Sequence, residues 1–180
     1  MKKLHEEILI AGAGGQGVLQ LGRIIARAAI QSGLNATFYP TYGAEIRGGT
    51  ANCSVRISAD EISSPVILSP GKMIILNNPS LLKFAGKLRE NGTLAVNSSL
   101  ARVNGAAKGN PLVIEIPATE IALSMGDVRC ANTVILGAFA GKTGLFEEEF
   151  LVSAIRETFG HKPGAVKINL RALKKGMAHK

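Results

Sequence analysis

The sequence lacks several features that define common classes of protein. It has no tryptophan and only 4% aromatic residues, and it shows no pattern of an RNA-binding or zinc-finger domain, so a nucleic-acid partner is not expected. Its two cysteines, Cys53 and Cys130, form no CxxC pair, which argues against a zinc ribbon or an iron–sulfur cluster held by this chain alone. We interpret both thiols as small buried residues of the core.

Long apolar runs are also missing. No apolar segment approaches the roughly 18 residues that a membrane span requires. His5, Glu6 and Glu7 interrupt what would be the apolar region of a signal peptide behind Lys2 and Lys3. We therefore expect a cytoplasmic protein with reduced thiols and no membrane partner.

Acidic residues are outnumbered by basic ones. The chain of 180 residues has 21 Lys and Arg against 13 Asp and Glu, a formal net charge of +8. A basic surface attracts nucleic acid, anionic lipid, acidic cofactors or acidic proteins, and charge alone does not choose among them. The stretch from Lys162 to Lys180 has five Lys and one Arg with no acid, which we interpret as a solvated terminal helix.

Small and aliphatic residues are abundant. A hydrophobic fraction of 46% and 21 glycines favour helices packed closely on a sheet, and the length predicts one domain over residues 1–180. The order of elements predicts an α/β fold, a Rossmann-like three-layer domain with a mixed, mainly parallel sheet. Strands are predicted at 6–12, 35–42, 51–58, 73–76, 93–97 and 112–116, helices at 16–32, 79–91, 131–141, 146–160 and near 168–177, and a short turn at 119–126.

A glycine-rich turn joins the first strand to the first helix. GAGGQG at 12–17 satisfies G-x-G-x-x-G, a pattern that lets a phosphate approach backbone amides at the positive end of a helix. The same glycines would equally serve close packing of the helix or the approach of another protein chain. Because 34–44 has no acid for a ribose and no Arg or Lys for a 2′-phosphate, a nicotinamide cofactor is disfavoured. The candidate cofactor-binding residues are Gly12, Gly14, Gly15, Gln16 and Gly17, with Asn97 at the end of a later strand.

The segment YGAEIRGG at 42–49 is unusual for a loop between two strands. It combines an aromatic residue, an acid, a base and three glycines, so it is a candidate for function. Glu45 and Arg47 can pair with each other or with a partner subunit. The candidate interface residues are Tyr42, Gly43, Glu45, Arg47, Gly48 and Gly49.

Together these motifs resemble a known family. GAGGQG at 12–17, YGAEIRGG at 42–49, TANCSVRIS at 50–58, AVNS at 95–98 and ANTVILGA at 131–138 are similar to the gamma subunit of 2-oxoacid:ferredoxin oxidoreductases. The resemblance covers most of residues 6–141. It implies a subunit of an enzyme that oxidatively decarboxylates a 2-oxoacid with coenzyme A, giving acyl-CoA, CO2 and reduced ferredoxin.

The resemblance also implies which groups this chain does not carry. Thiamine diphosphate, Mg²⁺ and iron–sulfur clusters would lie on alpha, beta and ferredoxin-like delta subunits, with coenzyme A as a substrate. The sequence has no GDG thiamine motif, since Gly126 and Asp127 are followed by Val128, and we identify no catalytic or metal-ligating residue. The chain would then have a structural role with a contribution to the coenzyme A site. The sequence leaves open whether the isolated chain forms a homodimer.

Two questions stay open at this point. Among substrates we favour 2-oxoglutarate over pyruvate and branched-chain oxoacids, and we place aryl pyruvates lower because that branch tends to carry HGMAQRGG-like sequence at the loop. The alternative function is a stand-alone nucleotide-binding Rossmann-like oxidoreductase domain, which would bind a nucleotide by itself.

Overall fold

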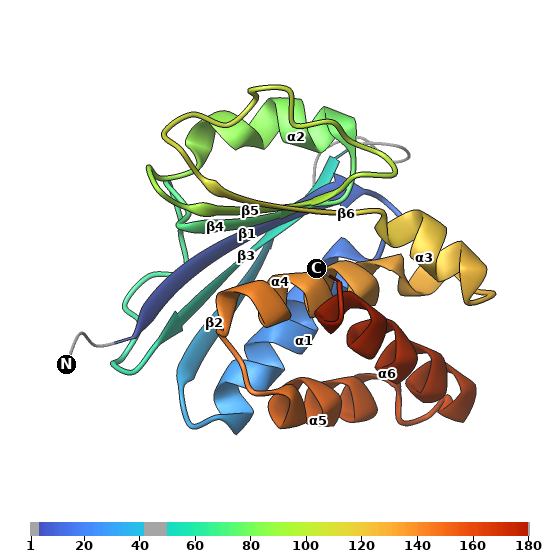
Figure 1. Ribbon diagram of the computed structural model, residues 1–180. Helices are drawn as coiled ribbons and strands as arrows, with labels where there is room; N and C mark the ends of the chain where they lie inside the picture. Colours follow the sequence, from blue (N-terminus) through green and yellow to red (C-terminus); the bar gives the residue numbers. More distant parts are fainter. Residues whose placement is uncertain (1–3, 42–49, 180) are drawn as a thin grey trace.

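A six-stranded sheet runs through the middle of the molecule in the computed structural model, which describes residues 4–41 and 50–179 (Figure 1). The strands are β1 (His5–Ala13), β2 (Asn35–Thr41), β3 (Thr50–Ser58), β4 (Lys72–Ile75), β5 (Thr93–Asn97) and β6 (Leu112–Ile116). Their order is β2-β3-β1-β4-β5-β6. β1, β4, β5 and β6 are parallel, whereas β3 is antiparallel to both of its neighbours. The predicted mixed, mainly parallel sheet is confirmed.

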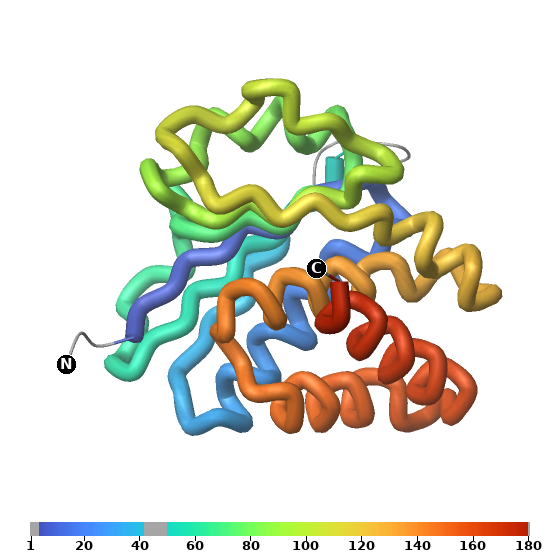
Figure 2. The backbone as a smooth tube through the Cα atoms, viewed as in Figure 1, coloured from blue at the N-terminus to red at the C-terminus, as the bar shows by residue number. Residues whose placement is uncertain are grey.

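Helices cover both faces of this sheet (Figure 1). On one face lie α2 (Asn78–Phe84), its 3₁₀ extension (Ala85–Lys87) and the segment between β5 and β6, whose path Figure 2 shows. The remaining helices belong to the other face and its edge: α1 (Val18–Gln31), α3 (Ala118–Ser124), a 3₁₀ turn (Val128–Cys130), α4 (Ala131–Thr143), α5 (Glu148–Phe159) and α6 (Pro163–Met177). The predicted three-layer arrangement is therefore confirmed.

The alternation of side chains along β1 divides the core in two. Ile8 and Ile10 point into a large core beneath the sheet, whereas Leu9 and Ala11 point into a smaller core under α2. All four residues are buried. The central strand thus supports both layers, as expected for an apolar run that is covered on both faces.

Both cysteines lie in the large core, as the sequence predicted. Cys53 on β3 is fully buried, and burial raises the pKa of its thiol to about 12. Cys130 is 1% exposed, and burial, with a smaller contribution from Asp127, raises the pKa of its thiol as well. Neither thiol is therefore set up as a thiolate nucleophile.

The last helix is held by direct backbone contact with α4. A Cβ atom added to Gly176 would lie 2.0 Å from the carbonyl oxygen of Val134, and one added to Gly137 would lie 2.2 Å from that of Leu173. Side chains at these two positions would force the helices apart. The glycines therefore let α6 close the large core.

Ion pairs gather at the end of the sheet where β1 begins. Glu7, whose side chain is 10% exposed, pairs with both Arg56 and Arg89. Beside it, Lys72 Nζ lies 2.6 Å from Glu6 Oε2. Arg56 also donates hydrogen bonds to two carbonyl oxygens of the irregular segment between β3 and β4, at 2.7 and 3.0 Å. This cluster fixes that segment to the sheet.

Several predicted helix boundaries were wrong. α6 begins at Pro163 and not near residue 168, because a proline is well suited to the first turn of a helix. α2 ends at Phe84 and continues only as a 3₁₀ turn, while the predicted turn at 119–126 contains the helix α3. Within the two described ranges, no helix is both long and apolar enough to cross a membrane.

Candidate functional site

A small cavity opens at the carboxyl ends of the parallel strands. Its volume is about 220 Å³. Crevices at this edge of an open α/β sheet are where ligands usually bind. Its polar lining comes from four parts of the chain: Gly15 and Gln16 in the glycine-rich turn, Asn97 on β5, Thr119 on α3, and Arg129 and Asn132 around the start of α4.

Gln16 organises the glycine-rich turn. Its Oε1 accepts a hydrogen bond from the Ala13 amide at 2.7 Å and another from Asn77 Nδ2 at 3.2 Å. Its Nε2 donates to the Leu76 carbonyl oxygen at 3.4 Å. One side chain therefore links the turn to the residues that follow β4. It also occupies the Ala13 amide, which a phosphate ligand would otherwise use.

The glycines of the turn have two different surroundings. A Cβ atom on Gly17, which has a φ of 74°, would lie 2.3 Å from Asn132 Nδ2, and one on Gly12 would lie 2.7 Å from Gln16 Oε1. At Gly14 and Gly15 nothing described lies within 4 Å of such an atom. Gly12 and Gly17 thus serve packing within the chain, whereas Gly14 and Gly15 present backbone to the outside.

Asn97 joins β5 to the start of α3. Its Nδ2 donates to Thr119 Oγ1 at 2.8 Å and to the Leu76 carbonyl oxygen at 3.4 Å, and its Oδ1 accepts from the Thr119 amide at 3.3 Å. The residue is 2% exposed. A buried amide in this network aligns the wall of the cavity by satisfying backbone and hydroxyl groups.

Arg129 carries the charge among the described residues that line the cavity. Its Nε lies 2.8 Å from Asp127 Oδ1 and its Nη2 lies 2.7 Å from Asp127 Oδ2, a two-point ion pair. The Arg129 side chain, which is 86% exposed, holds the pKa of the Asp127 carboxyl below its ordinary value. The guanidinium therefore stands at the mouth of the cavity, where it can meet an anionic group.

This lining suits binding and not proton transfer. Asn, Gln, Thr and backbone groups form hydrogen bonds without titrating near neutral pH. Across the described residues there is no group of three His, Cys, Asp or Glu side chains placed to hold a metal ion. Among its described residues, the cavity has one cation, Arg129, and otherwise neutral groups, several of which form hydrogen bonds.

The structure brings together part of the predicted site. Gly15, Gln16 and Asn97 line the cavity, Gly12 and Gly17 pack beside it, and Gly14 faces outward. The candidate interface residues Tyr42, Gly43, Glu45, Arg47, Gly48 and Gly49 lie outside the described residues, and Thr50, which follows them, pairs with Ala13 at the turn.

Three polar residues of the site, Asn77, Thr119 and Asn132, are not among the candidate residues that the sequence predicted. Asn132 Nδ2 donates to the Gly17 carbonyl oxygen at 3.2 Å, so it does face the turn. Asn77 and Thr119 come shortly after the ends of β4 and β6, and this position in the sequence could have identified them as candidates. Polar residues directly after parallel strands gather at one edge of the sheet.

The chain matches one family model and several known proteins. The family model, described as pyruvate ferredoxin/flavodoxin oxidoreductase, matches residues 7–179. A ketoisovalerate oxidoreductase subunit of Methanothermobacter marburgensis is 43% identical over 171 residues, 94% of this chain. The keto/oxoacid ferredoxin oxidoreductase gamma subunit of Geobacter sulfurreducens has a similar fold, with a TM-score of 0.82 and 30% identity over 97% of this chain and 95% of that one.

A third similar structure is a larger protein. The 2-oxoglutarate:ferredoxin oxidoreductase of Magnetococcus marinus, with 2-oxoglutarate, coenzyme A and succinyl-CoA bound, matches 99% of this chain with a TM-score of 0.88 and 26% identity. The present chain spans 31% of that chain and 35% of the ketoisovalerate relative. It therefore corresponds to about a third of these two proteins and to nearly the whole of the Geobacter subunit.

Proposed function

The chain belongs to the pyruvate ferredoxin/flavodoxin oxidoreductase family, and from this premise we propose that it is the gamma subunit of a multisubunit 2-oxoacid:ferredoxin oxidoreductase. Residues 1–180 form one functional domain in this proposal. The observation that carries it is the similarity along the whole length to a chain described as a gamma subunit. The alternative, a stand-alone nucleotide-binding oxidoreductase, receives no support from these relatives.

The reaction takes place on partner subunits in this proposal. Thiamine diphosphate, Mg²⁺ and iron–sulfur clusters lie on alpha, beta and delta chains, and ferredoxin accepts the electrons. The lining of the cavity, which has one cation and no carboxylate among its described residues, does not match a magnesium diphosphate. We accordingly assign no catalytic residue to this chain, and we place the complex in the cytoplasm.

The proposed role of the cavity is to hold part of coenzyme A. Coenzyme A has an amide-bearing arm and several phosphates, which match the neutral hydrogen-bonding groups of the lining and the Arg129 guanidinium. A volume of about 220 Å³ takes only a portion of such a molecule, and the remainder would lie between subunits. The outward-facing Gly14 and Gly15, with Tyr42–Gly49, form the proposed contact with the thiamine-bearing subunits.

The choice of 2-oxoacid remains a proposal about the whole complex. The sequence alone led us to rank 2-oxoglutarate first. The identity of 43% to a ketoisovalerate oxidoreductase subunit, against 32% to a 2-oxoglutarate synthase subunit, supports testing a branched-chain oxoacid beside it. Both substrates belong in the first assay.

The test is an anaerobic purification of the chain with its partners, followed by an assay of 2-oxoacid- and coenzyme A-dependent viologen reduction. We expect thiamine-binding and ferredoxin-like chains to copurify with activity. Arg129→Ala should raise the KM for coenzyme A about tenfold, because a charge-assisted hydrogen bond contributes about 1.5–3 kcal/mol, while kcat stays the same. Arg156→Ala, on α5 away from the cavity, is the control.

Two results would count against the proposal. Purification of the chain alone, with no oxoacid-dependent activity, contradicts the subunit assignment. An unchanged KM for coenzyme A in Arg129→Ala contradicts the role of the cavity and leaves the subunit assignment intact.

A further inference from the structure

Basic side chains are concentrated in the part of the chain that forms the α2 layer and the strands beneath it. Residues 62–111 contain six Lys and Arg and a single acid, Glu90, whereas residues 112–179 contain eight basic and seven acidic side chains. Five of the eight net positive charges therefore lie in one short region. A surface with charge of one sign creates a local field that acts on charged partners.

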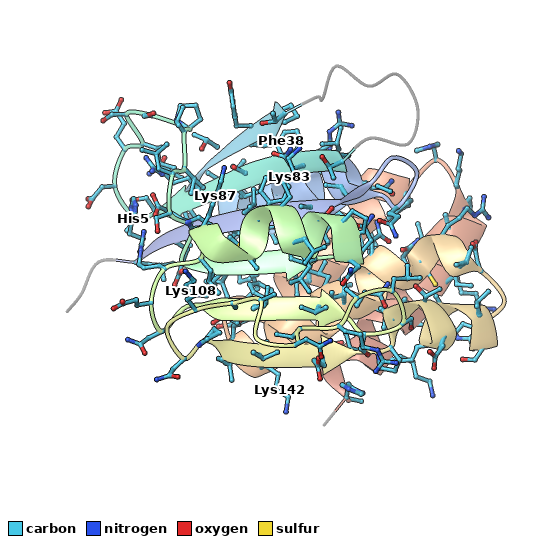
Figure 3. The ribbon with its side chains drawn as sticks, turned by 90° about the horizontal axis from the view of Figure 1, so that it is seen from above. His5, Phe38, Lys83, Lys87, Lys108 and Lys142 are labelled. Atoms are coloured by element: carbon cyan, nitrogen blue, oxygen red, sulfur yellow. The ribbon has the colours of Figure 1, made fainter. Side chains whose placement is uncertain are left out.

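Two of the six basic residues in this region have a role in the fold. Lys72 pairs with Glu6, and Arg89 pairs with Glu7. The other four are exposed and form no ion pair with an acid of residues 4–41 or 50–179: Lys83, Lys87, Arg102 and Lys108. Figure 3 looks onto this side of the sheet, and Lys83 and Lys87 lie along α2 with Lys108 beyond them.

Lys83 and Lys87 form the centre of this face. Each ammonium group lies 5.6 Å from the centre of the Phe84 ring, and Lys83 Nζ also donates to Thr50 Oγ1 at 2.9 Å. Lys83 lies in the last turn of α2 and Lys87 in its 3₁₀ extension, where a cation complements the helix dipole, and both residues remain exposed. Leu82 beside them is 73% exposed and supplies an apolar contact point.

The composition of the face indicates the kind of partner. The cores of permanent interfaces are depleted in lysine, so this face does not resemble a buried contact between subunits. Complementary charge speeds the encounter of partners that bind and leave repeatedly. Exposed lysines around one leucine therefore match a transient partner with carboxylates around an apolar patch.

We propose that this face, Leu82, Lys83, Lys87 and Lys108, docks the electron-acceptor protein of the complex, an acidic ferredoxin. The inference rests on the proposed function, which supplies an acceptor that must bind and leave in every turnover. It assigns no electron carrier to this chain. The face provides an electrostatic contact that brings the acceptor to the complex.

The experiment uses the assembled complex with the double variant Lys83→Glu/Lys87→Glu. Reduction of ferredoxin and reduction of methyl viologen are measured separately, at low salt and at about 0.15 M salt, where charges are screened beyond about 8 Å. We expect the KM for ferredoxin to rise about tenfold at low salt and to lose most of its salt dependence. Viologen reduction, which needs no protein docking, should be unchanged and shows that the variant complex is folded.

The matched control is Lys174→Glu/Lys175→Glu on α6, which makes the same change in charge on the other side of the sheet. An unchanged KM for ferredoxin in Lys83→Glu/Lys87→Glu overturns the inference, and an equal rise in both double variants reduces it to an effect of net charge.

Other partners would give different results. A DNA duplex that binds the wild-type complex more tightly than ferredoxin does, and that does not bind the α2 variant, would assign the face to nucleic acid. A change of oligomeric state confined to the α2 variant would assign it to a second copy of the chain. A wild-type complex without viologen reduction contradicts the proposed function itself.

Discussion

The two ends of the parallel strands are built from different chemistry. At the amino end, Glu7 lies between Arg56 and Arg89 and forms an ion pair with each of them. At the carboxyl end, Gln16 and Asn97 form hydrogen bonds with a hydroxyl group, another side-chain amide and a backbone carbonyl. Both ends fix loops to the same strands, but only the carboxyl end surrounds the cavity described above.

The difference shows why the ligand site is at the carboxyl end. A partly buried ion pair stabilises the fold only when both partners are present. Removal of one partner leaves an unpaired charge in the protein interior, where it is poorly solvated. An amide has several donors and acceptors, so it can keep its neighbours and still form a further hydrogen bond to a ligand. The amino end is therefore a structural anchor, and the carboxyl end retains capacity for binding.

The largest expected effect comes from breaking the charged end. Glu7→Gln keeps the shape of the side chain but leaves Arg56, whose side chain is 18% exposed, without its carboxylate. We expect a loss of about 3 kcal/mol in the free energy of unfolding, measured by urea denaturation. Glu149→Gln, which makes the same change on the exposed first turn of α5, should cost only a few tenths of a kcal/mol. Equal losses in the two variants would contradict the anchor role.

A smaller effect is expected at the amide end. Asn97→Ala removes the hydrogen bonds to Thr119 and Leu76 and should cost about 1–2 kcal/mol in the same measurement. Asn35→Ala, at an exposed position on β2, should change stability by less than about 0.5 kcal/mol. A loss at Asn97 larger than that at Glu7 would reverse the comparison.

The smallest effect concerns the ion pair between Arg129 and Asp127 at the carboxyl end. Arg129 lowers the pKa of the Asp127 carboxyl from its ordinary value of 3.8, so the pair contributes fully above that value and its contribution is lost as the pH falls through the lowered one. Because both groups are solvated, the contribution is small. Between pH 5 and pH 8, urea midpoints of the wild type and Asp127→Asn should run in parallel, and they should converge below about pH 4. A difference that first develops near neutral pH would contradict this assignment.

Local patterns predicted most of the fold. The apolar run before GAGGQG and the change of period after it located β1, the turn and α1 within a few residues. The predicted helix boundaries were wrong where a single residue, and not the apolar spacing, determined where the helix begins or ends. Pro163 starts α6 before its apolar spacing becomes regular, and the helical part of α2 stops short of Gly86.

The candidate site was harder to predict because its contacts join distant parts of the chain. Asn97 was found because it ends a strand. The hydrogen bonds from Asn77 to Gln16 and from Asn132 to Gly17 join residues 61 and 115 positions apart. No local pattern carries that information, since it depends on strand order and on how α4 meets the turn.

The central place of β1 has a consequence for how the protein is made. This strand leaves the ribosome before its hydrogen-bonding partners β3 and β4, which extend to Ser58 and Ile75. At roughly 5–20 residues per second, the backbone N–H and C=O groups of β1 stay unpaired for several seconds during synthesis. An unpaired strand of this kind adds readily to other chains. A chaperone that covers residues 5–13 during synthesis should therefore raise the yield of folded protein more than any change to the surface of the folded molecule.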